Sequence, residues 1–419
     1  MRICDVRTAV VEANFDYTFV RVYTDTDLVG IGECFPGPGL TRVIRDLKDV
    51  IVGEDPRNVE KVWHRMYQAI SGNSPIGGVG FNAISGIECA LLDIAGKHLN
   101  VPVYQLLGGW YRSRVRIYTD CHAGKGLESL TPTLLPRTPH WMAALSDDDG
   151  LVTHEDDIAE VYSPAAYARK ARTALDKGYT AIKFDLDVPT PSNPTIGVQT
   201  LEPYNRIISN ADIDFLTSIV RAVSEEVGPT VHTAYDLHWM YNMNDALRLA
   251  FALEPHHIGW LEDPVPPENV EGLAFITRQT QTPILSGENW HLRQGFREAF
   301  ERRAVNVIAP DFQRAGGLME GKKISDMADL YGIPLAPHCI SSPIGLMASA
   351  HVCVATPNFV ALEFHGQDVP FWESLALISG ADAVIQNGYV APRGPGLGIE
   401  LNDDVAREYA KEGESFFGA

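Results

Sequence analysis

Residues 231–288 read VHTAYDLHWMYNMNDALRLAFALEPHHIGWLEDPVPPENVEGLAFITRQTQTPILSGE and contain three short apolar runs, each of which leads to an acidic residue. These residues are Asp236, Glu262 and Glu288, and the interval from each to the next is 26 residues. Equal spacing of this length is typical of one strand plus one helix per unit. In a closed barrel of such units the C-terminal ends of neighbouring strands meet at one mouth, so we expect the three carboxylates to converge there.

Converging carboxylates of this kind require a cation. Carboxylate oxygens suit hard divalent ions, and a small set of side chains with open positions favours Mg²⁺ over a transition metal. We therefore predict a Mg²⁺ site formed by Asp236, Glu262 and Glu288, and a metal-dependent enzyme is the first hypothesis.

The alternation of strands and helices continues on both sides of this stretch. The strand-like runs are RVRIYTD (114–120), AIKFDLD (181–187), VHTAYD (231–236), IGWLE (258–262), PILSG (283–287), VNVIAPD (305–311), PLAPH (334–338) and VALEF (360–364). Strands that alternate with helices pair in parallel through right-handed crossovers, and eight of them close a barrel. Ser163 as N-cap, Pro164 in the first turn and Gly178 just past the end mark the helix between the first two strands.

The barrel is predicted over residues 114–390, after a small α+β domain at 1–113. That domain has strand-like runs at 2–12 and 19–25 and an amphipathic helix at 82–98. The glycine-rich run 71–81 is either a mobile surface loop or a segment that closes over a ligand. The turn-rich segment 391–419 is expected to leave the barrel and pack elsewhere.

Two long excursions, 126–162 and 187–210, follow barrel strands and are therefore expected at the mouth. They either shape a substrate pocket or form a solvated or oligomer-contacting surface.

The composition limits the classes of partner. With 419 residues and 45% apolar residues the chain is able to bury a large core. A net charge of −20 argues against a nucleic-acid partner and gives no sign of a membrane anchor. The six cysteines have no CxxC spacing, and the N-terminus has no apolar stretch long enough for a signal peptide. We expect a cytoplasmic protein.

Polar residues on two neighbouring strands are candidates for catalysis and substrate binding. Residues i and i+2 of a strand share a face, so His238 is expected to lie with Asp236 beside the metal, and Lys183 with Asp185. Lys183 either binds a substrate carboxylate or, with a lowered pKa, moves a proton, and a structural ion pair with Asp185 is the alternative.

Asp311 and His338 close two adjacent predicted strands and are expected to touch. An aspartate bonded to one imidazole nitrogen fixes the tautomer and makes the other nitrogen a general base. Glu363 closes the eighth strand and either bonds an oxyanion or orients a lysine or histidine. Lys183, Asp185 and Glu363 are therefore the candidate substrate-binding residues.

Other polar residues near the mouth receive lesser roles. Asp263 is expected to point away from Glu262 and to act as a supporting partner or a loop cap, while Asn289 and Trp290 are expected to line the pocket. Surface or packing roles are expected for His256, His257, His291 and His365.

Several long motifs carry a resemblance to a known family. They are DLH on the third strand, APHC on the seventh, and the stretches KFDLDVP, WLEDPVPPEN, SSPIGLMASAHVC and GPGLGIE. In these motifs the chain resembles the mandelate racemase branch of the enolase superfamily over essentially its whole length. Within that branch it is similar to the galactonate dehydratases and to the archaeal-type xylonate/gluconate dehydratases.

The resemblance implies a modified (β/α)7β TIM barrel with an N-terminal α+β cap, a C-terminal segment that returns to the cap, and a homo-oligomer. It also implies Mg²⁺ on the three carboxylates and the Asp311–His338 base pair. Racemases of the branch carry KxK on the second strand, whereas this chain has Lys183-x-Asp185. Simple two-base racemisation is thereby disfavoured, although His238 is able in principle to replace the second lysine.

The implied reaction is that of a hydro-lyase acting on a sugar acid such as xylonate, gluconate or galactonate. His338 removes the C2 proton to give an ene-diolate, His238 protonates the departing 3-hydroxyl, and a 2-keto-3-deoxy acid results. Side chains of 12–20, 71–81 and 126–162 are expected to read the hydroxyl configuration. A sugar-acid epimerase or cycloisomerase, and a non-catalytic relative, are the alternatives.

Overall fold

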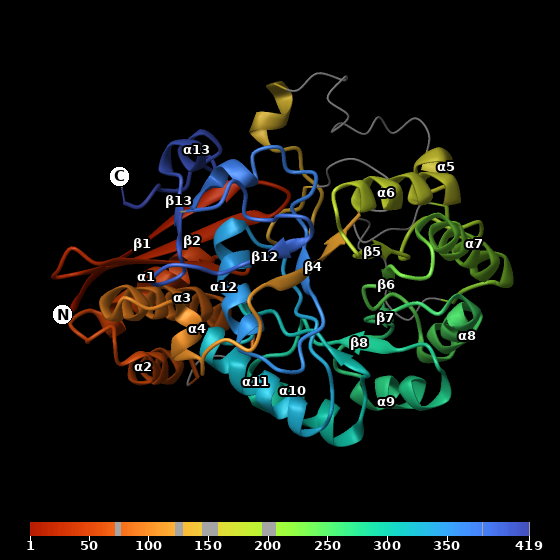
Figure 1. Cartoon of the computed structure of the whole chain (residues 1–419), viewed down its shortest axis with the longest axis horizontal. Coiled ribbons are helices and arrows are strands. Elements are labelled where there is room, and N and C mark those ends of the chain that lie inside the picture. The colour runs from red at the N-terminus through yellow and green to blue at the C-terminus, as the bar shows by residue number, and fades with distance from the viewer. Residues whose placement is uncertain (72–76, 122–128, 145–157, 195–206, 379, 419) are drawn as a thin grey trace.

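The computed structural model describes the chain except for residues 72–76, 122–128, 145–157, 195–206, 379 and 419. The N-terminal part forms a three-stranded antiparallel sheet with strand order β1-β2-β3, covered by helices (Figure 1). Its elements are β1 (Ile3–Glu12), β2 (Asp16–Thr24), β3 (Val29–Cys34), α1 (Leu40–Ile51), α2 (Val59–Ser71), α3 (Val79–Leu99) and α4 (Val103–Leu106). We call this part the cap.

Helix α3 is the central helix of the cap and packs closely on β3. A Cβ on Gly32 would lie 2.1 Å from the carbonyl oxygen of Gly86, so only glycine permits this approach. Among the described residues α3 is also the one helix whose length and apolar character would suit a membrane span, but 94% of that stretch is buried inside the protein. Its apolar surface is therefore explained by packing within the fold.

The second part is a curled parallel sheet in which seven strands follow the order β10-β4-β5-β6-β7-β8-β9. The strands are β4 (Val115–Asp120), β5 (Ala181–Asp185), β6 (His232–Asp236), β7 (Trp260–Glu262), β8 (Ile284–Ser286), β9 (Val307–Ile308) and β10 (Leu362–Phe364). Leu335 closes the ring, because it bridges in parallel to Ile308 on one side and to Phe359 on the other. The predicted architecture of cap and barrel is thus confirmed, with the seventh strand reduced to one bridged residue.

In the part of the chain that the structure describes, seven helices of ten or more residues surround the barrel, and each lies between two consecutive barrel strands. They are α6 (Pro164–Asp176), α7 (Asn210–Val227), α8 (Met243–Leu253), α9 (Val270–Gln279), α10 (Leu292–Arg302), α11 (Leu318–Leu330) and α12 (Pro343–Val354), with the short α5 (Ile158–Val161) before α6. Ser163 caps α6, its side chain accepting a hydrogen bond from Ala166 N, and Pro164 is the first helical residue. Gly178 follows the helix with φ of 89°, so both predicted ends of α6 are correct.

Two buried carboxylates of the cap bind the N-termini of two barrel helices. Glu88 on α3 accepts hydrogen bonds from Leu318 N and Met319 N at the start of α11, at 2.8 and 2.9 Å. Glu33 on β3 accepts bonds from Ser342 N and Gly345 N at the start of α12, both at 2.9 Å. The first N–H groups of a helix have no partner within the helix, so these acids satisfy buried donors and fasten the cap to the barrel.

The C-terminal segment contacts both parts of the molecule. Strand β12 (Tyr389–Val390) pairs antiparallel with β4, and β13 (Ile399–Leu401) pairs with β11 (Ala376–Ile378). Beyond them, α13 (Asp403–Glu408) places Asp403 against Arg21 of β2, with its two oxygens 2.8 and 2.5 Å from the guanidinium nitrogens. The end of the chain therefore lies on the cap (Figure 1).

Candidate active site

The three predicted metal ligands meet at the C-terminal ends of adjacent strands. Asp236 and Glu262 are the last residues of β6 and β7 and are paired in register, and Glu288 lies two residues beyond β8. All three are buried, and one ligand oxygen of each lies within 4.8 Å of the others. The equal spacing in the sequence thus corresponds to one strand-and-helix step per carboxylate.

Lys183 on β5 faces this cluster rather than Asp185. Its Nζ lies 2.7 Å from Glu363 Oε1, 3.1 Å from Asp236 Oδ2 and 3.4 Å from Glu262 Oε1. Burial alone would lower the pKa of the lysine, but these carboxylates raise it well above its ordinary value. Lys183 therefore keeps its charge, and of the two predicted roles carboxylate binding fits better than proton transfer.

The donor set suits a divalent cation with oxygen ligands. Glu262 Oε1 is buried and makes no hydrogen bond within the described residues, and Trp260 Nε1 donates to the other oxygen at 3.1 Å. Burial and neighbouring carboxylates raise the pKa of Glu262 well above its ordinary value. Lys183 is a single positive charge beside four carboxylates, those of Asp236, Glu262, Glu363 and Asp120, so a dication would relieve the remaining repulsion.

His338 and Asp311 form the predicted pair at the Glu288 end of the cluster. His338 Nδ1 lies 2.7 Å from Asp311 Oδ2, and Nε2 lies 3.3 Å from Glu288 Oε2. Gln313 N donates to the other oxygen of Asp311, which fixes the carboxylate. Burial opposes the charge on the ring, but Glu288 and Glu363 raise the pKa of His338 to about 10. A cation held by Glu288 would weaken that effect and free Nε2 to accept a proton.

His238 lies at the Asp236 end of the cluster, as predicted, but for a different reason. Strand β6 ends at Asp236, and His238 and Trp239 have left-handed φ angles of 39° and 63°. The His238 N–H donates to Asp236 Oδ1 at 2.9 Å, and Nε2 lies 3.7 Å from Asp236 Oδ2. A tight turn held by Asp236, and not strand alternation, therefore brings the imidazole to the mouth.

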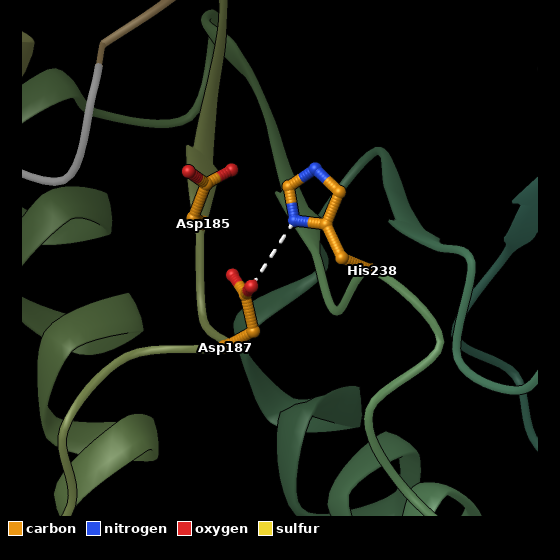
Figure 2. A group of neighbouring side chains, drawn as sticks. All are labelled: Asp185, Asp187 and His238. Carbon is orange, nitrogen blue, oxygen red and sulfur yellow. Dashed lines mark ion pairs between the residues drawn. The ribbon is translucent and has the colours of Figure 1, made fainter. Parts of the chain in front are cut away.

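The two acidic candidates for substrate binding do not reach the cavity at the mouth. Glu363 Oε2 accepts a hydrogen bond from Cys339 N and Oε1 contacts Lys183, a geometry compatible with the second of its predicted roles, the orientation of a lysine. Asp185 lies instead with Asp187 beside His238 (Figure 2). Neither Glu363 nor Asp185 is among the described residues that line the cavity. Direct contact of these two with substrate stays a prediction without support from the geometry.

A cavity of about 520 Å³ opens above the cluster between the cap and the barrel mouth. Lys183, Glu288, His238 and His338 form its floor, and its walls include Phe15 and Phe35 of the cap, Val79, and residues 130–132 and 134. Each of the three segments expected to read hydroxyl configuration thus contributes described lining residues. The parts of those segments at 72–76, 126–128 and 145–157 lie outside the described residues.

Sequence reasoning missed four charged or titratable residues among the described lining, namely Asp120, Glu268, Arg314 and His365. Asp120 closes β4 and lies 3.6 Å from Nε2 of His365, whose main-chain carbonyl accepts a bond from Asn14 of the cap. Arg314 packs over the ring of Phe35 at the same cavity. The signal was present, because Asp120 ends the first strand as Asp236 ends the third, and His365 stands two residues after Glu363.

The positions of Asn289 and Asp263 agree with the predictions made for them, and that of Trp290 does not. Asn289 lines the cavity, but Trp290 turns away and donates through Nε1 to Pro267 O at 3.0 Å. Asp263 accepts bonds from Ser286 Oγ and Trp239 Nε1, which is the supporting role expected of it. This contact with Trp239 fixes the turn that carries His238.

A capped parallel barrel whose mouth holds three carboxylates, a lysine and a histidine–aspartate pair defines the chain as a member of the enolase superfamily. The model for the mandelate racemase/muconate lactonizing enzyme N-terminal domain matches residues 6–108, and the enolase C-terminal domain-like model matches 166–405. The chain belongs to this mandelate racemase/muconate lactonizing enzyme family.

Individual relatives are similar over nearly the whole chain. A D-xylonate dehydratase of Haloferax volcanii is 41% identical over 99% of this chain and 90% of its own length. A D-galactonate dehydratase of Ralstonia pickettii is 29% identical over 94% of this chain and 91% of its own. The crystal structure of a mandelate racemase/muconate lactonizing enzyme-like protein from Rubrobacter xylanophilus has 39% identity and a TM-score of 0.87, covering 100% of this chain and 99% of that chain.

Proposed function

We propose that this chain is a Mg²⁺-dependent hydro-lyase that removes water from a sugar acid and releases the 2-keto-3-deoxy acid. The observation that carries the proposal is the placement of two histidines at the two ends of one carboxylate cluster, His338 at Glu288 and His238 at Asp236. Elimination of water needs a base for one carbon and an acid for the next. The dehydratases among the relatives support the same reaction class.

Asp236, Glu262 and Glu288 would hold Mg²⁺, which when bound polarises the substrate carboxylate and makes the C2 proton more acidic. Lys183 presents a fixed positive charge on the cavity floor, where it is able to bind the same carboxylate. His338 takes the C2 proton on Nε2, because Asp311 occupies Nδ1.

His238 gives a proton to the 3-hydroxyl, so that the C3–O bond breaks and water leaves. The enol that remains loses the proton of its 2-hydroxyl, takes a proton at C3 and becomes the 2-keto-3-deoxy acid, so the reaction consumes a sugar acid and yields a keto acid and water. A base and an acid on separate histidines thus account for the two proton transfers of the elimination.

The first test is a screen of the purified protein with Mg²⁺ against a stereochemically complete set of five- and six-carbon aldonic acids. Formation of a 2-keto acid is measured, with an EDTA-treated sample as control, and xylonate, gluconate and galactonate are the expected substrates. A C2 epimer or a rearranged lactone without any keto acid would instead assign the site to epimerisation or cycloisomerisation. Silence across the set contradicts aldonate dehydration.

The cellular setting and the assembly are further parts of the proposal. All six cysteines are unpaired, which suits a reducing cytoplasm. A homo-oligomer is expected from the family, and sedimentation of the purified protein at micromolar concentration tests it. A species with the mass of the 46.0 kDa chain alone would contradict it.

A further inference from the structure

Asp187 contacts Nδ1 of His238, as Asp311 contacts Nδ1 of His338. Asp187 Oδ2 lies 3.3 Å from His238 Nδ1, and the contact joins residues just beyond two adjacent strands, β5 and β6 (Figure 2). His238 lines the cavity and is 25% exposed at its side chain, whereas the side chain of Asp187 is 2% exposed and is not among the described lining residues. Asp187 therefore meets the cavity only through the imidazole.

The register of the two strands produces this contact. Asp185 and Asp236, the last residues of β5 and β6, are paired, so the segments that follow the two strands, including the turn at His238, bring Asp187 beside His238. Leu186 N donates to Asp236 O at 2.7 Å, which holds the two segments together beyond the last ladder pair. The contact is thus fixed by backbone pairing and not by chance packing of side chains.

Within the described residues, both atoms of the contact lack another hydrogen-bond partner. Asp187 Oδ2 and His238 Nδ1 are buried and make no hydrogen bond within the described residues. Catalytic hydrogen bonds are often long before substrate binds, and a small rotation of the ring would satisfy both atoms at once. The backbone of His238 is anchored on Asp236, so the orientation of the ring is what Asp187 is placed to control.

We propose that Asp187 is a positioning residue, which accepts a hydrogen bond from Nδ1 of His238 and directs Nε2 toward the leaving 3-hydroxyl. This inference rests on the proposed dehydratase reaction and adds a second oriented histidine to it. In the step concerned the C3–O bond breaks, the proton on Nε2 moves to the departing oxygen, and water is released.

The test compares Asp187→Ala and Asp187→Asn with the wild-type chain, using the sugar acid that the wild type dehydrates. Loss of the acceptor should lower kcat about 10- to 100-fold, the range found when a supporting hydrogen bond is removed, with KM changed less than about twofold. The asparagine variant keeps an acceptor oxygen and should recover part of the rate. Asp245→Asn changes a buried aspartate at the start of α8 that does not line the cavity, and it should leave kcat unaltered.

Two further measurements separate positioning from general damage. In a His238→Gln background Asp187→Ala should cost nothing more, because its effect passes through the ring. A 3-deoxy-3-fluoro substrate, whose leaving group needs less protonation, should show a much smaller defect. Equal losses in both backgrounds or with both substrates would overturn the inference.

Two other results are also decisive. A wild-type rate in Asp187→Ala would overturn the inference while leaving the proposed function intact, whereas inactivity of the wild type toward every sugar acid would remove the proposed function itself. Two bound divalent ions per chain, with one lost in Asp187→Asn, would assign Asp185, Asp187 and His238 to a second cation and contradict positioning.

Discussion

Buried acids occur in two regions of this molecule, and their partners differ. At the seam between cap and barrel, Glu33 and Glu88 accept hydrogen bonds from backbone N–H groups at helix N-termini. At the mouth, Glu262 and Glu363 are equally buried, but each has one oxygen without a hydrogen bond within the described residues, facing Lys183.

The difference separates the acids of the framework from those of the candidate site. A buried acid whose oxygens meet fixed N–H donors is part of the framework, because helix ends require such partners. A buried acid that shares a single lysine with other acids is held in a costly arrangement that the fold alone does not require. Burial by itself therefore does not identify a site, and the nature of the partner does.

The largest effect is expected when a predicted metal ligand at the barrel mouth is replaced. Asp236→Asn should lower kcat/KM at least about 10³-fold, because a metal contributes several kcal/mol to the transition state. Bound Mg²⁺, measured by isothermal titration, should fall as well, while thermal stability should hold or rise because repulsion is relieved. Asp93→Asn alters a fully buried acid of the cap and serves as the control. Full activity in Asp236→Asn would contradict the metal assignment.

The second largest effect is expected at the proposed base. His338→Asn should reduce turnover about 10²- to 10⁴-fold, the usual share of an acid–base group, and leave Mg²⁺ binding intact. His351→Asn is the matched control, since His351 is fully buried and its Nδ1 accepts a bond from Tyr104 N far from the mouth. Loss of metal in His338→Asn would mean that His338 supports the cluster instead of taking a proton.

A smaller effect, on stability, is expected at the seam. Glu88→Ala leaves two buried N–H groups unpaired and should lower the free energy of unfolding by about 2–4 kcal/mol. Turnover per folded molecule should change little. Glu60→Ala removes an exposed acid of α2 that pairs with Lys323 of α11, the helix whose N-terminus Glu88 binds. This change should lower the free energy of unfolding by less than about 0.5 kcal/mol. Denaturant unfolding measures both, and equal losses would contradict a capping role.

The smallest expected effect is a pH dependence of stability. Burial raises the pKa of Glu88 from 4.5 to about 7, so between these values the folded chain binds more protons than the unfolded chain. Stability should therefore fall as the pH rises from about 4.5 to 7 and then level off. Glu88→Gln should reduce the loss of unfolding free energy over this pH interval by about 1–3 kcal/mol. Denaturant unfolding at pH 5 and pH 8 tests this, and an unchanged slope would contradict the raised pKa.

Much of the mouth could be predicted from the sequence, because one periodic pattern controls it. Asp236, Glu262 and Glu288 follow from equal spacing, and the contact between Asp311 and His338 follows from adjacency of strands. Both depend on local strand ends, which short apolar runs mark well. The seventh strand was placed correctly, although only Leu335 makes bridges there.

What the sequence did not reveal depends on long-range contacts. The seam acids Glu33 and Glu88 bond to residues more than 200 positions away, and no local pattern marks them. His365 reaches the cavity beside Asn14 of the cap, which strand alternation does not indicate. The position of Asp187 could have been inferred from the sequence. Once Asp236 is aligned with Asp185 on the neighbouring parallel strand, the residues that follow each strand place Asp187 beside His238.

The seam also bears on how this family can be recombined. A Cβ on Gly317 would lie 2.5 Å from Glu88 Oε2, and one on Gly345 would lie 2.5 Å from Ser341 Cβ and 2.9 Å from Glu33 Oε2, so a side chain at either position would displace groups at the contact between cap and barrel. A chimera that joined the cap of one relative to the barrel of another would need both acid–glycine pairs to match. In the construction of chimeras, the cap and the barrel of this chain are therefore better transferred together than separately.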